Sequence, residues 1–212
     1  GVTDAESTPR LLSEDKKTEL ASSGAVKPGV FDFAAAFTAL RKNSELLLGL
    51  SPASCPSISM ASVSEAYGNH TITLSPNAVN VWNLTVAEMA QINNLDAPNR
   101  PGGATELIIN VTDSGAVTLP VRYWKALAKE NQASSVMWNF PNASSVTITQ
   151  SLLGSVLAPN AAVTMYDVNV DGDVVAQSLD FRPWTAELAH FDGHTSEEYF
   201  EGHFPDVPVM PG

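Results

Sequence analysis

Cysteine is nearly absent from this chain of 212 residues: the only one is Cys55, between Pro52 and Pro56. No disulfide can form within the chain, so either the fold needs none or Cys55 pairs with a second chain. A transmembrane helix needs about 20 consecutive apolar residues, and no run in the sequence approaches that length. The sequence therefore predicts neither a disulfide scaffold nor a membrane-spanning segment.

Charge is scarce as well, since charged residues make up only 16% of the chain. The formal net charge of −12 argues against a protein that binds a nucleic-acid backbone. Ser, Thr, Asn, Ala and Val take the place of charge, which is typical of secreted β-rich surface proteins. We therefore expect an extracellular or cell-surface protein. No signal peptide precedes Gly1, which favours a processed fragment.

A repeat runs through residues 137–189. Residues 141–143 (Pro-Asn-Ala) recur eighteen residues later as residues 159–161, and Gly154 recurs at the same interval as Gly172. Apolar and polar residues alternate between these markers with the period of a β-strand. Coils of about 18 residues with turns at their corners can stack, so the sequence predicts a mainly β chain folded as a β-solenoid. The alternative is a chance repetition.

The alternation assigns each residue of the repeat to one side of its strand. The residues expected to be buried are Val146, Ile148, Val163, Met165, Val168 and Val170. The residues expected to face outward are Thr147, Thr149, Thr164 and Asn169.

Local signals divide the rest of the chain. Residues 1–29 are polar and predict a surface arm or linker, residues 30–182 form the expected solenoid domain, and residues 183–212 are an extended aromatic and proline-rich tail. Asp32 suits the N-cap of a helix over residues 32–48. The positions expected on the buried face of this helix are Phe33, Phe37, Leu40, Ser44 and Leu47.

Shorter elements are expected between this helix and the repeat. Residues 51–66 are rich in Ser and Pro and predict a loop. Thr85 and Glu88 form a capping box that opens a short helix through about Asn94, and another short helix is expected within residues 121–130. The expected strands are residues 71–74, 79–82, 107–111 and 116–119, and residues 113–115 (Asp-Ser-Gly) suit a hairpin or a solenoid corner.

Several segments, taken in order, carry a resemblance to a known family. They are Phe31-Asp-Phe-Ala-Ala-Ala36, Val79-Asn-Val-Trp82, Glu106-Leu-Ile-Ile-Asn-Val111, Met137-Trp-Asn-Phe-Pro141, Gly154-Ser-Val-Leu-Ala-Pro-Asn-Ala161 and Val170-Asp-Gly-Asp-Val-Val-Ala176. This series resembles the choice-of-anchor A family of secreted, often surface-attached, adhesin-like proteins over roughly residues 30–190. The resemblance implies an extracellular location and a surface or matrix role, and it implies no chemistry.

The solenoid with its accompanying helix also resembles the ice-binding β-solenoid family. The β-rich segment that usually precedes the helix in choice-of-anchor A proteins is missing here. The resemblance therefore implies an incomplete solenoid with an open end.

The tail carries a second resemblance, to the active-site segment of hot-dog-fold 3-hydroxyacyl-thioester dehydratases. It covers residues 195–212, and it implies that His203 matches the catalytic base that removes a β-hydroxyl as water. The helix and the catalytic carboxylate that follow this segment in the family are absent, so His203 has no partner to orient it. Either the string is accidental, or the chain is truncated or misassigned at its end. A dehydratase is kept as the enzyme alternative to a protein without catalytic activity.

Two patterns are considered as metal sites. Residues 167–173 copy the first half of an EF-hand loop, but the twelfth position is Ser178 rather than a bidentate Glu, and a corner between strands would use the same residues. The calcium candidates are Asp167, Asn169, Asp171 and Asp173. His190 and His194 lie near His203, but no second pair of ligands has metal spacing. We expect no cofactor, with calcium as the alternative.

Four Asn-x-Ser/Thr sequons are candidates for glycosylation. They begin at Asn69, Asn83, Asn110 and Asn142. Asn110 lies inside a segment that carries the family resemblance, and Asn83 and Asn142 directly follow two others, which favours structural roles for these three. Asn69, beside Gly68 in an expected loop, is the best candidate for a glycan.

Together these patterns favour a protein that binds or builds over one that catalyses. The hypothesis is an extracellular adhesin-like or structural protein that assembles head to tail, with the aromatic tail adding to the open edge of a second copy. The expected assembly anchors are Phe181, Trp184, Phe191, Tyr199, Phe200 and Phe204. Ice binding through Thr147, Thr149 and Thr164 is a further alternative, but three threonines are few for the long flat array that ice requires.

Overall fold

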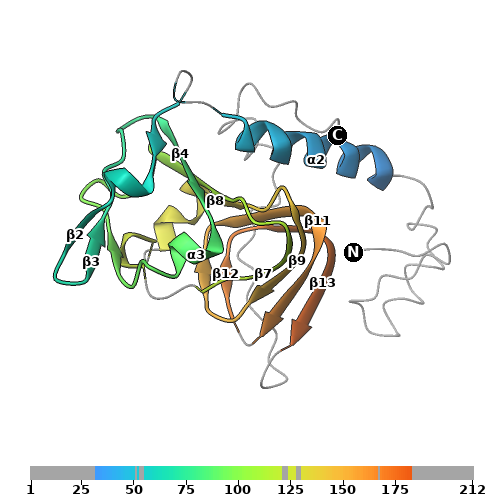
Figure 1. Ribbon diagram of the computed structural model, residues 1–212. Coiled ribbons are helices and arrows are strands. Elements are labelled where there is room, and N and C mark those ends of the chain that lie inside the picture. The colour runs from blue at the N-terminus through green and yellow to red at the C-terminus, as the bar shows by residue number, and fades with distance from the viewer. Residues whose placement is uncertain are drawn as a thin grey trace. The chain divides into compact units, whose positions relative to one another are not determined.

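The computed structural model describes residues 32–50, 52, 55–120, 124–127, 130–166 and 168–182 (Figure 1). The chain divides into two compact units, residues 1–37 and 38–212, and the packing described below lies within the second. The expected arm over residues 1–29 and the expected tail over residues 183–212 lie outside the described residues.

Helix α2 spans Phe33–Leu48, close to the expected range. Asp32 caps it, because its Oδ1 accepts a hydrogen bond of 2.9 Å from the backbone N–H of Ala35. Leu40, Ser44 and Leu47 are buried as expected. Phe33 is 49% exposed, so the prediction of a buried position is wrong there, and the buried face of α2 is shorter than the spacing indicated.

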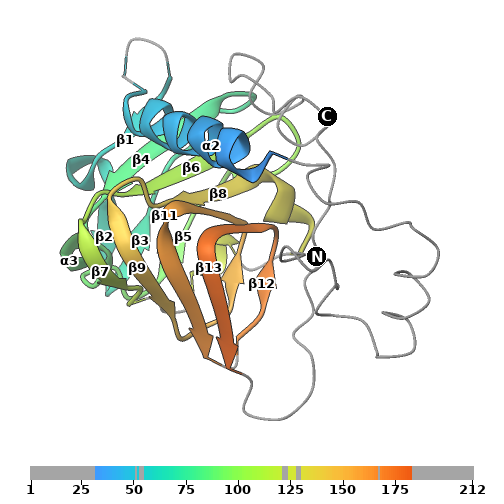
Figure 2. The same ribbon diagram turned by 90° about the vertical axis from the view of Figure 1, so that its right-hand side faces the viewer.

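One curled sheet of parallel strands dominates the second unit. Its order is β1 (Ser57–Ile58), β4 (Val79–Leu84), β6 (Glu106–Val111), β8 (Val136–Asn139), β11 (Ser155–Tyr166), β9 (Ala143–Ile148) and β7 (Gly115–Thr118). β13 (Val174–Arg182) pairs with the other edge of β11. The first part of β11 pairs with β8 and its second part with β9, so this long strand carries the sheet around a bend (Figure 2).

Two small sheets accompany the large one. β10 (Leu152–Leu153) pairs with β12 (Val170–Asp171) in parallel. β2 (Ser64–Ala66) forms an antiparallel hairpin with β3 (Asn69–Thr71), which also pairs with β5 (Leu95–Asp96). These pairs lie outside the curled sheet.

The short elements partly differ from the expectation. The loop expected over residues 51–66 holds β1, a 3₁₀ turn η1 (Met60–Ser62) and β2, because Ile58, Met60 and Val63 pack against the core. The strand expected over residues 71–74 lies instead at β3. Residues 113–115 are a corner rather than a hairpin, since β6 and β7 pair with different strands.

The two expected short helices are shorter than the sequence indicated. The capping box of Thr85 and Glu88 is confirmed, with Glu88 N–H donating to Thr85 Oγ1, but α3 (Val86–Met89) ends before Asn94. Among their described residues, residues 121–130 hold a 3₁₀ turn, η2 (Lys125–Leu127), and the first residue of another, η3 (Glu130–Ser135).

The eighteen-residue interval is visible as stacked strand positions. Ser155 pairs with Met137 below it, and Val156 pairs with Val174 above it, each eighteen residues away. The prediction of a mainly β chain with parallel stacking is therefore confirmed. A complete solenoid is not confirmed. Apart from the curled sheet, β10 and β12 are the only strand pair described in these coils.

The core lies inside the curl of the sheet. All six apolar residues of the repeat that were expected to be buried are at most 5% exposed, whereas Thr147, Thr149 and Thr164 face outward, as the alternation predicted. Trp82, Trp124 and Trp138 stack in the same core with ring centroids 5.9 and 5.7 Å apart. The large apolar area of these side chains stabilises the core beside β4 and β8.

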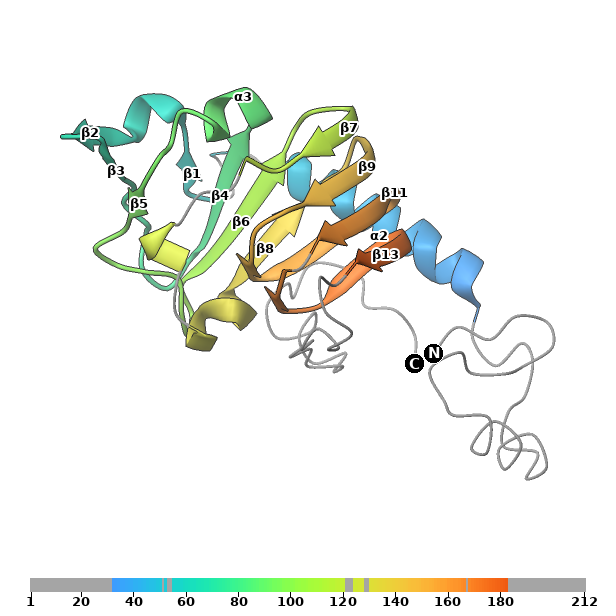
Figure 3. The same cartoon turned by 90° about the horizontal axis from the view of Figure 1, so that it is seen from below.

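The opposite face of the sheet is buried under residues 38–48 of α2. β4, β6 and β8 are neighbouring strands (Figure 3), and Asn83, Asn110 and Asn139 occupy one register position on them. Asn139 Nδ2 donates to Asn110 Oδ1 at 2.8 Å, and Asn110 Nδ2 donates to Asn83 Oδ1 at 2.7 Å. We call these three residues the asparagine ladder.

The helix completes the asparagine ladder. Ser44 Oγ donates to Asn139 Oδ1 at 2.5 Å, and Asn139 Nδ2 also donates to the Ser44 carbonyl. Asn110 Nδ2 donates to the carbonyl of Leu47 at 3.1 Å. Because buried amides are costly unless they are hydrogen-bonded, these contacts fix the position of the helix over the sheet.

Candidate binding face

The outward side of β7, β9, β11 and β13 is a flat array of short side chains. These four strands lie side by side (Figure 3), and their register aligns the outward residues in two ranks across the strands. The first rank is Ala116, Ser145, Ala162 and Ser178. The second rank is Thr118, Thr147, Thr164 and Asp180. We call these eight residues the binding face.

The ranks follow directly from strand geometry. Successive side chains of a strand point to opposite sides, and neighbouring strands lie about 4.8 Å apart. Thr118, Thr147 and Thr164 therefore present three hydroxyl and three methyl groups at one regular spacing. The inward neighbours Val117, Val146 and Val163 are at most 2% exposed. The part of the binding face on β7, β9 and β11 is consequently held rigid by the core beneath it.

The sequence indicated only part of this array. It identified Thr147 and Thr164, which the structure brings together, but it missed Thr118, which belongs to the same rank. Thr149 was expected to share the array, but it follows the end of β9 at Ile148 and is not paired in the rank. The period-two pattern at residues 116–119 is a signal that assigns Thr118 to the outward side, although it does not give the register.

A cluster of larger side chains borders the second rank. Arg182 forms an ion pair of 2.6 Å with Asp180, and its guanidinium carbon lies 5.4 Å from the ring centroid of Tyr166. Its Nη1 also donates to the Tyr166 hydroxyl at 3.4 Å. The hydrogen bond from Arg182 to Asp180 raises the pKa of the guanidinium further, so Arg182 is positively charged at neutral pH. We call these three residues the corner cluster.

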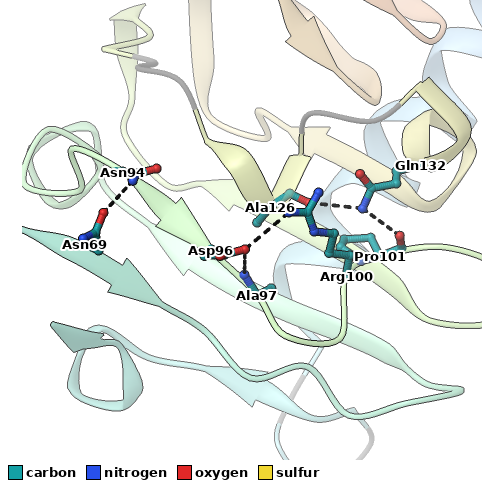
Figure 4. Close-up of polar contacts among 8 residues, drawn as sticks. All are labelled: Asn69, Asn94, Asp96, Ala97, Arg100, Pro101, Ala126 and Gln132. Atoms are coloured by element: carbon teal, nitrogen blue, oxygen red, sulfur yellow. Dashed lines mark hydrogen bonds and ion pairs between the residues drawn. The ribbon is translucent and has the colours of Figure 1, made fainter. Parts of the chain in front are cut away.

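The loops around β5 hold a separate group of polar contacts (Figure 4). Asn94 Nδ2 donates to Asn69 Oδ1 at 2.6 Å, and Arg100 forms an ion pair of 3.6 Å with Asp96. Buried Gln132 donates to the backbone carbonyls of residues 101 and 126. These contacts join loop segments to one another, so we assign them a structural role.

The four sequons lie in different environments. Asn69, Asn83 and Asn142 are exposed. Asn110 is fully buried and belongs to the asparagine ladder, which is the structural role that the sequence favoured. A glycan on Asn110 would require its amide to leave the ladder, whereas the other three sites remain candidates.

The proposed calcium positions lie at a turn between coils. Asn169 and Asp171 flank the start of β12, and Asp173 follows Gly172; Asp167 lies outside the described residues. The N–H groups of Asn169 and Asp173 donate to Ser151 Oγ and Ser155 Oγ of the coil below. No cluster of three or more His, Cys, Asp or Glu side chains occurs among the described residues.

Several other predicted residues have no described position or only a partial one. Trp184, His190, Phe191, His194, Tyr199, Phe200, His203 and Phe204 lie outside the described residues. Phe181 lies on β13 and packs in part against the core of its own chain. Cys55 is a free, half-buried thiol whose pKa is raised by burial.

One carboxyl is perturbed. Glu106 begins β6, and burial raises its pKa from 4.5 to about 7. Its Oε2 is buried and has no hydrogen-bond partner among the described residues. The folded state therefore binds the proton more tightly than the unfolded state, and this contribution to stability is complete below pH 4.5 and lost as the pH rises to about 7.

Glu106→Gln is expected to remove that pH dependence. The variant should unfold at the same free energy as the parent near pH 4 and be more stable by about 1–2 kcal/mol at pH 8, a range reduced because the side chain is partly exposed. Urea unfolding at both pH values measures the difference. Glu45→Gln, at an exposed position of α2, controls for the loss of one carboxylate. An equal gain at both pH values would contradict the assignment.

Comparisons with known proteins bear on the whole domain. A family model described as "Putative Ice-binding-like adhesive domain" matches residues 4–188. No curated protein and no solved structure matches the chain. The adhesin-like character expected from the sequence is thus confirmed, whereas the match does not name the choice-of-anchor A family. No helix among the described residues is long and apolar enough to cross a membrane.

Proposed function

Because the chain belongs to the ice-binding-like adhesive domain family, we propose that it is an extracellular adhesin-like domain that attaches through its binding face. The observation that carries this proposal is the alignment of two ranks of short side chains across β7, β9, β11 and β13. A rigid, regular face presents many weak contacts at once without ordering flexible side chains on binding. Such pre-organisation lowers the entropic cost of association.

The charge of the chain supports a non-nucleic-acid target. The net charge of −12 disfavours polyanions, and the binding face itself holds one charged residue, Asp180, which is paired with Arg182. The contact is therefore made by hydroxyl and methyl groups more than by net charge. We assign no catalytic role and no cofactor to this face.

The attachment test uses beads coated with the full chain in a flow cell. The surfaces are immobilised mucin, collagen, crystalline cellulose and ice. We expect retention on at least one surface, and Thr147→Lys should reduce it at least tenfold, because a long charged side chain would stand in the middle of the second rank. Thr73→Lys, at an exposed threonine away from the binding face, is the matched control. Retention that survives Thr147→Lys, or no retention on any surface, would refute the proposal.

Ice is the second candidate target, and one observation favours it. Thr118, Thr147 and Thr164 form an aligned threonine rank on three neighbouring strands. The rank is short, and it ends at Asp180 beside the larger side chains of the corner cluster. Thermal hysteresis of the purified chain tests this candidate, and Thr147→Lys should abolish any hysteresis that is measured.

Self-association remains part of the proposal. The outer edge of β13 pairs with no strand among the described residues, and its inward Leu179 is 45% exposed. Unpaired edges accept strands from other chains. We propose that the tail, residues 183–212, docks on this edge of a second copy through its aromatic residues.

Deletion of residues 183–212 tests the assembly. The truncated chain is expected to keep its unfolding transition and to lose concentration-dependent assembly, as measured by analytical ultracentrifugation and light scattering. Leu179→Lys in the full chain should have the same effect, since it places a charge on the acceptor edge. A truncated chain that assembles as the full chain does would exclude the tail.

A further inference from the structure

We propose that the corner cluster makes the binding face a site for neutral glycans. This inference rests on the proposed function and specifies its ligand. Tyr166, Asp180 and Arg182 come from adjacent strands and lie on the same outward side as the threonine rank. Together with Thr164 they offer an aromatic ring, a carboxylate, a guanidinium and a hydroxyl within one small area.

The aromatic ring is accessible. Tyr166 is 42% exposed, although Arg182 lies over its ring with a hydrogen bond to its hydroxyl. The guanidinium lies over the ring and, with its hydrogen bond to the hydroxyl, holds the side chain in one position. An exposed aromatic side chain that is held in one position binds an apolar surface at low entropic cost. The C–H face of a pyranose ring is such a surface.

The polar groups suit a ligand that carries hydroxyls. A carboxylate accepts hydrogen bonds from two adjacent hydroxyl groups, and a guanidinium donates to their oxygens in a planar fork. Thr118, Thr147 and Thr164 both donate and accept at one strand spacing, so they continue this pattern away from the corner cluster. A chain of sugar units along the second rank would meet a hydroxyl on each of β7, β9 and β11 and the carboxylate of Asp180 on β13.

The charges select for a neutral ligand. Asp180 and Arg182 are the only charged residues in the binding face and corner cluster, and their charges cancel in an ion pair of 2.6 Å. The chain around them carries a net charge of −12, which repels sulfated or sialylated glycans. A cationic peptide would find no unpaired carboxylate on this face. The protruding ring and guanidinium also interrupt the flat plane that ice requires.

The test is a glycan microarray that carries neutral, sialylated and sulfated oligosaccharides and is probed with the full chain. We expect retention on neutral glycans only. The best neutral oligosaccharide is then titrated by calorimetry, where Tyr166→Ala should raise Kd at least tenfold and Tyr166→Phe should raise it less, because the ring remains. Tyr67→Ala is the matched control. Tyr67 is a fully exposed tyrosine in the β2–β3 hairpin, which is not part of the sheet that carries the binding face.

Three results would overturn the inference. They are the absence of binding to any neutral glycan, binding to anionic glycans alone, and a Kd that Tyr166→Ala leaves unchanged. Unfolding curves of each variant show whether a loss of binding is a loss of fold. If coated beads attach, Thr147→Lys abolishes that attachment and the chain binds no glycan, this inference fails but the proposed function stands. Attachment that Thr147→Lys leaves intact removes the proposed function itself.

Discussion

Gly172→Ala is expected to lower the free energy of unfolding by about 2–4 kcal/mol. Gly172 has φ of +152°, and a Cβ atom added there would lie 2.6 Å from the carbonyl carbon and oxygen of Gly154. Both contacts are with backbone, which cannot turn aside as a flexible side chain can. The coil that starts at Gly172 would have to move away from the coil below it, and the strand pairing of β11 with β13 would weaken.

Urea unfolding followed by tryptophan fluorescence measures this effect, because the three stacked tryptophans report on the core. Gly102→Ala is the control: Gly102 has nearly the same φ, +151°, but a Cβ atom there meets nothing within 4 Å. It measures the cost of the backbone conformation without the close contact, which is about 1–3 kcal/mol. Equal losses at Gly172 and Gly102 would show that close stacking at Gly172 contributes nothing.

Asn139→Leu is expected to cost about 3 kcal/mol, although leucine is similar in size and apolar. The substitution removes two hydrogen bonds with Ser44 and one with Asn110. The side-chain Oδ1 of Asn110 and the hydroxyl and backbone carbonyl of Ser44 stay buried without these partners. An unsatisfied buried group costs about 1–3 kcal/mol. The loss of stability should be accompanied by a loss of helical circular-dichroism signal, because Ser44 lies on α2.

Asn83→Leu provides the comparison, since Asn83 is the exposed end of the same ladder and only accepts from Asn110. Its expected cost is about 1 kcal/mol. A double-mutant cycle of Asn139→Leu with Ser44→Ala measures the coupling between sheet and helix. Additive losses in that cycle would mean that the two side chains do not act as a unit.

Much of the fold could be predicted because it depends on local patterns. Alternation at Val146 and Ile148 determines which side is buried, and the capping box at Thr85 and Glu88 needs only neighbours three residues apart. The interval between Gly154 and Gly172 is visible for the same reason. Each of these signals is contained within one coil or within two consecutive coils.

The parts that could not be predicted depend on distant partners. Thr118 joins Thr147 in one rank only because β7 pairs with β9, and residues 121–135 interrupt the repeat between them. The asparagine ladder has the same origin, since Asn83 and Asn110 are 27 residues apart and Asn110 and Asn139 are 29 apart. No fixed period links these residues, so their register is determined by the sheet as a whole.

The helix and its docking site are also separated in the order of synthesis. Arg41 on α2 donates through Nε to Asn160 Oδ1 at 2.8 Å, and these residues are 119 positions apart. At about 5–20 residues per second, Asn160 leaves the ribosome roughly 6–24 s after Arg41. A 16-residue helix is only slightly longer than the roughly 12–15 residues below which an isolated helix is marginal, and most helical stability in proteins comes from tertiary packing. We therefore expect the nascent α2 to be incompletely folded until its docking site is made. Its apolar residues are exposed during that interval, which makes this segment the expected binding site for a chaperone on the growing chain.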